Sequence, residues 1–231
     1  MAHERHAGSG SSADAVYRAL VENIVSGALP SGWHLAEERL AGLFQVSRTP
    51  VREALMRLET EGLAEPDRRR GLVVGYVSAQ QIMDVYIIRE PLEGIAASLA
   101  ARFGSPIDFA ELEQINELMA QAALAQDFTR MASLNIEFHA VLARASRNQM
   151  LERFIEDIHR WVQRMPATTL AQPGRAEEAS AEHQRLIASL RASDASGAED
   201  LARLHIREAL SLRMLMQPRR TPAVPLANTA E

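Results

Sequence analysis

Two arginines one helical turn apart, Arg48 and Arg52, carry the clearest chemistry in this sequence. Ser47 precedes them and suits the position just before a helix, while Pro50 falls in the first turn, where its missing N–H costs little. Residues four apart lie on one face of a helix. At the exposed start of that helix, each planar guanidinium can donate two hydrogen bonds to a guanine edge or a phosphate. The pattern therefore predicts contact with DNA.

The flanking residues have the lengths and periods of a helix-turn-helix. A short amphipathic segment spans residues 36–44, and an apolar stripe at helical spacing follows Ser47. Gly62 is placed to end the second helix. Two short helices, a tight turn and arginines at the start of the second helix are what the major groove accepts. We predict a helix-turn-helix over about residues 36–61, with a buried stripe made of Val51, Leu55 and Leu58.

A basic turn follows the predicted recognition helix. Arg68-Arg69-Arg70-Gly71 lies between two short extended runs, residues 63–66 and 72–77, which predicts a β-hairpin wing. A solvated turn is the simpler interpretation of three arginines, but beside a recognition helix a phosphate or minor-groove contact is favoured. The candidate DNA-contacting residues of the helix and the wing are Ser47, Arg48, Thr49, Arg52, Arg68, Arg69, Arg70 and Gly71.

Composition limits the class of protein. The chain of 231 residues has a net charge of −5, and residues 1–78 hold 9 Arg against 10 Asp or Glu, so DNA binding must depend on where the charges lie. Cysteine is absent, which excludes disulfides and thiolate metal sites. No apolar run is long enough to span a membrane, and residues 1–12 lack the apolar segment of a signal peptide. We expect a cytoplasmic protein with no membrane partner.

The remainder of the chain has only helical patterns. Six of them are separated by short breaks of Gly, Pro, Ser or Asp, which predicts an antiparallel bundle of six or seven helices. The fold class is therefore mainly α, a winged helix-turn-helix followed by an all-α bundle. The predicted division is a disordered lead over residues 1–12, a DNA-binding domain over 13–78, a helical domain over 79–216 and a disordered tail over 217–231.

Histidines on three of the predicted bundle helices are candidate metal ligands. Asn135 and His139 are four residues apart and share a helix face, while His183 and His205 lie on the last two helices. Imidazole and oxygen donors suit Zn²⁺, Ni²⁺, Mn²⁺ or Fe²⁺. From spacing alone, however, scattered histidines are more typical of ordinary core or surface positions. The other histidines, which lack such placement, are His3, His6, His34 and His159.

Arg89 lies among apolar residues of the first bundle helix, where a charged group needs a partner. A salt bridge with Glu93, four residues later, is one interpretation. A contact with a bound carboxylate is the other. Tyr86, Arg160 and Trp161 are weaker candidates to line the same cavity.

Several of these motifs resemble a known family. Residues 13–78, with Leu29-Pro30-Ser31-Gly32, Val46–Leu55 and Glu61-Gly62-Leu63, resemble the winged helix-turn-helix of the GntR superfamily. The helical remainder, with the run Ile88-Arg89-Glu90-Pro91-Leu92-Glu93, is similar to the FadR branch and its FCD effector domain. The resemblance covers about residues 13–216. It departs at Glu38, where family members often carry an arginine, and Arg39 follows one residue later as a further candidate DNA contact.

The resemblance implies specific roles. It assigns Asn135, His139, His183 and His205 to one divalent metal, with a neutral amide where Asp is also common. It implies that Arg89 binds the carboxylate of a small organic acid beside that metal, in a cavity that we expect Tyr86 and Arg160 to line. A homodimer bound to a double-stranded DNA operator, most often as a repressor, is the expected assembly.

Two other functions remain open at this point. A metalloenzyme built on the histidines would need an open coordination position and a placed acid or base, and Glu137 points off the face shared by Asn135 and His139. An architectural DNA-binding dimer would use the bundle only to dimerise, with no effector. A DNA-binding regulator controlled by a metal-assisted organic acid is the favoured function.

Overall fold

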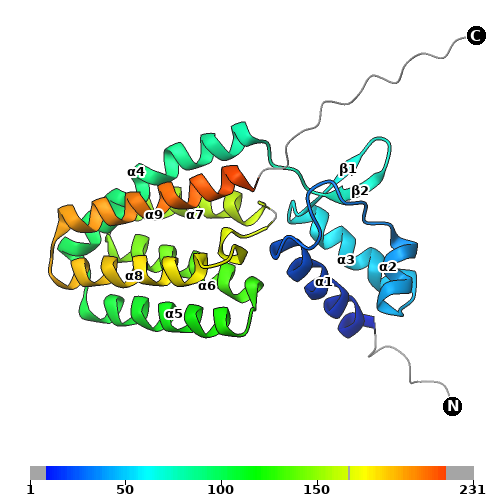
Figure 1. Ribbon diagram of the computed structural model, residues 1–231, viewed down its shortest axis with the longest axis horizontal. Coiled ribbons are helices and arrows are strands. Elements are labelled where there is room, and N and C mark those ends of the chain that lie inside the picture. Colours follow the sequence, from blue (N-terminus) through cyan, green and yellow to red (C-terminus); the bar gives the residue numbers. More distant parts are fainter. Residues whose placement is uncertain (1–8, 166, 217–231) are drawn as a thin grey trace, which may run out of the picture.

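The computed structural model describes residues 9–165 and 167–216, which form a small winged domain beside a helical bundle (Figure 1). The first helix, α1, spans Ser9–Val25. The predicted disordered lead is therefore wrong for residues 9–12. Further along the same helix, Val16, Leu20 and Ile24 are buried in the core of the winged domain. Residues 1–8 and the predicted tail over 217–231 lie outside the described residues.

The winged domain contains the predicted helix-turn-helix. Helix α2 spans Glu37–Phe44 and helix α3, the recognition helix, spans Arg48–Thr60. Ser47 occupies the position before α3 in an extended conformation, but its side chain makes no capping hydrogen bond, so the predicted cap is wrong in that respect. The helices enclose a core that contains Val16, Leu20, Ile24, Leu40, Val51, Leu55 and Leu58.

The recognition helix ends at Gly62 as predicted. Gly62 has a φ of +76°, its N–H donates to the carbonyl of Glu59, and the N–H of Leu63 donates to the carbonyl of Leu58. These two bonds satisfy carbonyls that the helix itself leaves free. Glycine adopts this left-handed backbone without steric cost.

The wing is a two-stranded antiparallel hairpin of β1, Ala64–Asp67, and β2, Gly71–Val74. The Asp67 carboxylate accepts from the backbone N–H groups of Arg69 and Arg70, which fixes the turn. The backbone N–H of Leu35 donates to the carbonyl of Leu72 and ties the hairpin to the segment before α2. The basic residues therefore lie on an ordered tip.

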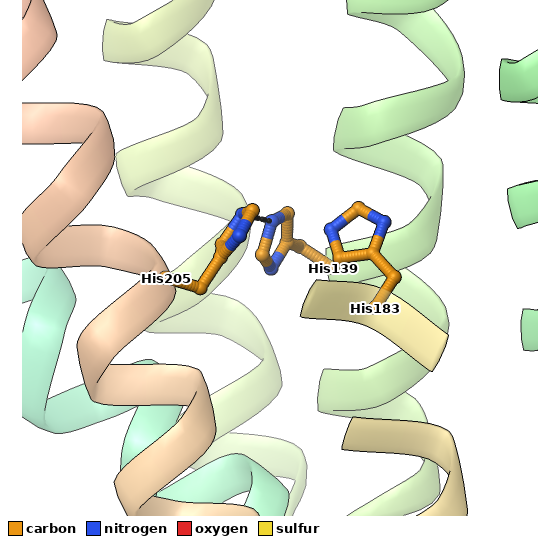
Figure 2. A group of neighbouring side chains, drawn as sticks. All are labelled: His139, His183 and His205. Atoms are coloured by element: carbon orange, nitrogen blue, oxygen red, sulfur yellow. Dashed lines mark hydrogen bonds between the residues drawn. The ribbon is translucent and has the colours of Figure 1, made fainter. Parts of the chain in front are cut away.

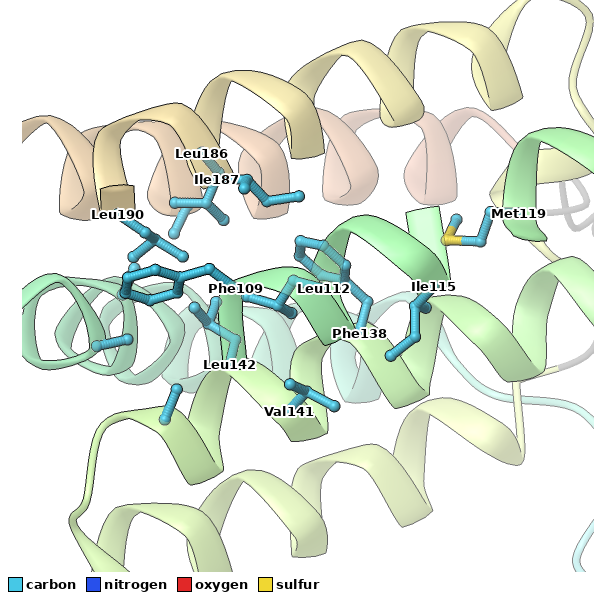
Figure 3. Close-up of a cluster of buried hydrophobic side chains, with 14 of the residues drawn as sticks. Phe109, Leu112, Ile115, Met119, Phe138, Val141, Leu142, Leu186, Ile187 and Leu190 are labelled. Atoms are coloured by element: carbon cyan, nitrogen blue, oxygen red, sulfur yellow. The ribbon is translucent and has the colours of Figure 1, made fainter. Parts of the chain in front are cut away.

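The bundle confirms the mainly α fold class. Within the described residues it consists of α4, Ala79–Phe103; α5, Pro106–Leu124; α6, Phe128–Ala145; α7, Gln149–Gln163; a short 3₁₀ turn, η1, Thr169–Ala171; α8, Arg175–Arg191; and α9, Ala195–Leu215. Phe109, Leu112, Phe138, Leu142 and Leu190 meet in its main core (Figure 3). No helix in the described ranges is long and apolar enough to cross a membrane.

The two domains are joined by more than the chain between them. The backbone N–H of Ala167 donates to the carbonyl of Ile24 (2.9 Å), and that of Thr168 donates to the carbonyl of Val25 (2.6 Å). A Cβ added at Gly62 would lie 3.1 Å from Cδ of Arg164. The segment that follows α7 thus contacts both the end of α1 and the end of α3.

Candidate metal centre and DNA-binding surface

Three buried histidines from different helices meet inside the bundle (Figure 2). His139 comes from α6, His183 from α8 and His205 from α9, and one ring nitrogen of each lies within 4.8 Å of the others. The Nε2 atoms of His139 and His205 are 3.3 Å apart. Three of the four metal ligands predicted from the sequence therefore lie together in the structure.

The opposite ring nitrogens each contact an oxygen. Nδ1 of His139 lies 3.0 Å from Oε2 of Glu93, and Nδ1 of His205 lies 2.6 Å from Oε2 of Glu182. Because an ionised carboxylate only accepts hydrogen bonds, both Nδ1 atoms donate. In the neutral imidazole, the Nε2 atoms then carry lone pairs rather than protons.

His183 follows the same pattern with an amide in place of a carboxylate. Its Nδ1 lies 3.2 Å from Oδ1 of Asn116. The Nδ2 group of Asn116 donates to the carbonyl of Ser180 at 3.1 Å, which fixes the amide so that its oxygen faces the imidazole. Nε2 of His183 is buried and has no hydrogen-bond partner among the described residues.

Asn135 supplies a fourth buried acceptor. It lies one turn before His139 on α6, and its Oδ1 lacks a hydrogen-bond partner within the described part of the chain. Nitrogen lone pairs that face one another, as those of His139 and His205 do, repel unless a proton or a cation lies between them. The three histidine nitrogens therefore fit a divalent cation, since two nitrogens on one Zn²⁺ at about 2.0–2.1 Å would lie about 3.3 Å apart.

The electrostatics keep the imidazoles neutral. Burial, with smaller contributions from Arg89 and His205, lowers the pKa of His139 to about 4. Burial also lowers the pKa of His205, and it lowers that of His183 to well below the ordinary value. Burial raises the pKa of Glu182, but hydrogen bonds from His205 and Arg175 outweigh it and lower that pKa to about 2. Neutral imidazole is the form that binds metal.

Glu93 connects the histidines to a second group of side chains. Its Oε1 accepts from Nε of Arg89 at 3.1 Å and lies 3.3 Å from Nε2 of His159. Burial raises the pKa of Glu93, but His139, His159 and Arg89 together hold it well below its usual range. His159, expected to be uninvolved, is thus buried in this network, because α7 packs beside α4.

Arg89 forms the predicted salt bridge with Glu93 and still has a donor that could bind a carboxylate. The salt bridge with Glu93 is present and fully buried. Nη2 of Arg89 is also buried, and nothing in the described residues accepts a hydrogen bond from it. The Arg89 guanidinium lies 5.5 Å from the ring centroid of Tyr86. Burial raises the pKa of Tyr86, but the charges of Arg213 and Arg89 lower it overall.

A cavity of about 540 Å³ opens beside the histidines. Tyr86, Arg89, Asn135, Arg160 and His205 are among the bundle residues that line it. Arg160 is largely exposed and pairs with Asp157. The proposed neighbour Trp161 does not line this cavity and is half exposed.

The winged domain forms part of the same cavity wall. Tyr17 and Val21 of α1, Glu61 at the end of α3 and Leu63 line it. Tyr17 donates to the Glu61 carboxylate, and burial together with this bond raises the pKa of Tyr17 to about 12. The cavity therefore lies between the histidine cluster and the domain that carries the recognition helix.

The predicted DNA-contacting residues of α3 are exposed, and two are held by acidic residues of α2. Nη2 of Arg48 lies 2.6 Å from Oε1 of Glu38. Nε and Nη2 of Arg52 lie 3.0 and 2.9 Å from the two carboxylate oxygens of Glu37. Ser47 and Thr49 are exposed on the same end of the helix. Neither ion pair was expected from the sequence.

The remaining basic candidates differ in their surroundings. The Arg39 guanidinium lies 4.6 Å from the ring centroid of Trp33. Arg70 donates from Nη1 to the carbonyl of Gly32 at 2.9 Å and contacts Asp67, so it braces the wing internally. Arg68 and Arg69 are exposed at the tip, and the neighbouring Gly71 has a φ of +78°.

Comparison with known proteins decides the family. Residues 12–74 match the gntR family of bacterial regulatory proteins, and residues 84–208 match the FCD domain. The chain belongs to the GntR family of transcriptional regulators and carries an FCD domain. It is 28% identical over 190 residues to the HTH-type transcriptional regulator YdhC of Bacillus subtilis, an alignment that covers 82% of this chain and 85% of YdhC.

Two Escherichia coli regulators are also similar. The chain is 30% identical to McbR over 175 residues, covering 74% of this chain and 78% of McbR, and 26% identical to the repressor RspR over 206 residues, covering 87% and 89%. A solved structure of E. coli McbR/YncC aligns with a TM-score of 0.60 at 25% identity, covering 88% of this chain and 97% of that one. The family consists of transcription regulators, so this GntR regulator is not the metalloenzyme considered above.

Two residues of the site were underestimated from the sequence, and two others were not considered. Glu93 was expected only as a partner of Arg89, and His159 was set aside. Asn116 and Glu182 were not considered. The one available signal was Asn116, an amide among apolar residues of α5, because a buried amide requires a partner. No local pattern distinguishes Glu182 from the other acidic residues of α8.

Proposed function

We propose that this GntR regulator is a homodimeric repressor whose operator affinity changes when a small carboxylate binds beside a divalent metal in the FCD domain. It would act in the cytoplasm, where its DNA lies. The observation that supports this most is that three buried atoms, Asn135 Oδ1, His183 Nε2 and Arg89 Nη2, have no hydrogen-bond partner among the described residues. The Nε2 atoms of His139 and His205 face each other in the same cluster as His183. A metal and an anion together would satisfy every one of these atoms.

Asn135, His139, His183 and His205 would hold the metal, which we expect to be Zn²⁺, Ni²⁺, Mn²⁺ or Fe²⁺. The bound ion would supply a positive charge and an open position for a ligand oxygen. Glu93, Glu182 and Asn116 would orient the imidazoles, as outer partners of metal ligands usually do. The low pKa values of the histidines support this function, because no proton must be displaced at neutral pH.

Arg89 would bind the carboxylate of the effector. Its Nε is used by Glu93, while Nη2 has no acceptor among the described side chains and backbone. A guanidinium presents its donors in a planar fork that matches a carboxylate. Tyr86 and Arg160, which line the cavity from α4 and α7, would contact the remainder of the acid.

Coupling to DNA would pass through the shared cavity wall. Tyr17 and Glu61 line it from the winged domain, and Ala167 and Thr168 clip the end of α1 to the segment after α7. A ligand shifts an equilibrium only if it binds one arrangement better than another. A cavity walled by both domains meets this condition, because its shape depends on how the domains pack.

Residues of α3 and the wing would contact the operator. We propose Arg48 and Arg52 for base edges, and Ser47, Thr49, Arg68 and Arg69 for the backbone. Gly71 would allow close approach of the wing tip. Arg39 and Arg70 are less available, since Arg39 stacks on Trp33 and Arg70 braces the wing.

Exposed apolar residues support a homodimer. Ile87, Ile88 and Ile95 on α4 are 41–60% exposed, as are Phe154 and Trp161 on the neighbouring α7 at 52% and 44%. A contiguous apolar patch usually marks a protein interface, and we propose that these side chains form one. A two-fold dimer would place two recognition helices on adjacent half-sites of a pseudo-palindromic operator. RspR is named as a repressor, which supports repression by this chain.

The deciding experiment combines metal analysis with a ligand screen. Tag-free protein should contain about one divalent metal per chain, and one organic acid should raise the unfolding midpoint only when the metal is present. The same acid should change the affinity of the protein for an operator selected from random DNA. Metal-free protein that responds to no acid yet binds DNA as a dimer would indicate the architectural function instead.

A further inference from the structure

We infer that Glu37 is a positioning residue for base recognition: it holds Arg52 by one edge so that the other edge faces a guanine. The inference rests on the proposed function, in which Arg52 reads bases. Glu37 contacts Arg52 with both carboxylate oxygens, at 3.0 Å to Nε and 2.9 Å to Nη2. The two residues are 15 positions apart and come from different helices.

The N–H groups that Arg52 donates to Glu37 determine which of its N–H groups remain free to contact DNA. A guanidinium has five N–H donors in one plane. Glu37 occupies the Nε–H and one N–H of Nη2, which leaves the outward edge formed by Nη1 and the second N–H of Nη2. That edge has the two parallel donors that match O6 and N7 of guanine. The carboxylate therefore leaves the base-reading edge of Arg52 free.

Stability does not account for the pair. Arg52 is 64% exposed and Glu37 is 36% exposed, and exposed ion pairs contribute little to folding. What the contact does change is the freedom of the arginine side chain. A side chain already fixed in its bound direction loses less conformational entropy when it meets DNA, and it rejects bases that do not fit.

The neighbouring pair provides a matched comparison. Glu38 is also in the first turn of α2 and also contacts a recognition arginine, Arg48. It does so through one oxygen at 2.6 Å, and its side chain is 82% exposed. A single contact does not fix the plane of a guanidinium. We therefore assign to Glu38 only a repulsion of DNA phosphates, which lowers affinity for all sequences alike.

The test measures the affinity of each protein variant, at fixed salt, for an operator selected from random DNA and for single-base variants of that operator. Arg52→Ala should lose about tenfold of discrimination at one base pair, within the range of a bidentate contact. Glu37→Gln should lose a similar factor at that same base pair while binding random DNA more tightly. Glu38→Gln should bind random DNA more tightly but keep the wild-type preference. The double variant of Glu37 and Arg52 should lose no more discrimination than Arg52→Ala.

The possible results separate the two ideas. If Arg52→Ala loses discrimination and Glu37→Gln keeps it, the positioning role is wrong and the proposed function stands. If Arg52→Ala keeps full discrimination, the recognition assignment fails and takes this inference with it. Equal losses in the two glutamate variants would also overturn the inference, because both remove one charge from the first turn of α2. Matching thermal midpoints would show that all variants are folded.

Discussion

His139 and His205 face each other through Nε2 atoms 3.3 Å apart, although each ring donates its Nδ1 proton to a different carboxylate. Two acceptors at this distance repel each other, and a cation bound between them would remove that repulsion. Because Glu93 and Glu182 are both held ionised, the two imidazoles are fixed in the tautomer that a metal requires.

The double variant His183→Ala/His205→Ala should lose bound metal, because it removes two of the four proposed ligands. Elemental analysis of tag-free protein measures this. Asn135→Asp should bind the metal more tightly, since a charged ligand replaces a neutral one. Full metal content in the double variant would contradict the ligand set, and weaker binding in Asn135→Asp would remove Asn135 from it.

Glu93→Gln should lower metal affinity about 10–100-fold, as loss of an outer carboxylate typically does. Gln can accept from His139, but it carries no charge to raise the basicity of the imidazole. Competition with a chelator measures the affinity. Glu137→Gln on the exposed face of α6 is the control and should be unchanged. Equal affinity in the two variants would show that Glu93 does not support a metal ligand.

Arg89→Ala should abolish the response to the organic acid while DNA binding without effector stays nearly normal. The Glu93 carboxylate would still contact His139 and His159. Arg89→Lys should restore little, because an ammonium cannot form the planar fork. A titration of operator affinity against the acid measures this. A wild-type response in Arg89→Ala would assign Arg89 solely to its salt bridge.

Arg69→Ala should weaken binding to all DNA sequences alike and reduce its salt dependence, because we propose that Arg69 contacts a phosphate. Arg70→Ala should instead lower the stability of the wing, since it loses the bond to the carbonyl of Gly32. Hydrogen exchange of β2 amides separates the two effects. A base-specific loss in Arg69→Ala would contradict the backbone assignment.

The metal-free protein should lose stability as the pH falls from about 6.5 toward 4. His139 titrates near 4 in the folded chain but near its ordinary value of 6.5 when unfolded. Between these values the unfolded chain binds more protons, so the free energy of unfolding decreases with falling pH. Urea unfolding after chelation measures it. His139→Asn should have a shallower dependence, and an equal slope would show that His139 is not responsible.

Local patterns were sufficient to predict the winged domain and the bundle helices. The stripe of Val51, Leu55 and Leu58 and the stop at Gly62 depend on neighbours within a few residues, so the sequence contains them directly. The histidines were found because their helices were found. The family resemblance, rather than spacing, indicated that they meet.

The partners of those residues could not be predicted in the same way. Glu93 reaches His139 across 46 positions, and which carboxylate does so depends on how α4 packs against α6 and α9. The pairs between α2 and α3 depend likewise on the angle between two helices. The sequence placed Glu37 and Glu38 in the first turn of α2, but gave no indication that each would contact a different arginine.

Gly62 has a consequence beyond ending the recognition helix. A Cβ there would lie 3.1 Å from Cδ of Arg164, which follows α7 and also lines the cavity. The end of α3 therefore packs closely against a residue of the cavity wall, with little room for a side chain at Gly62. We expect a ligand that moves Arg164 to displace the end of α3 as well.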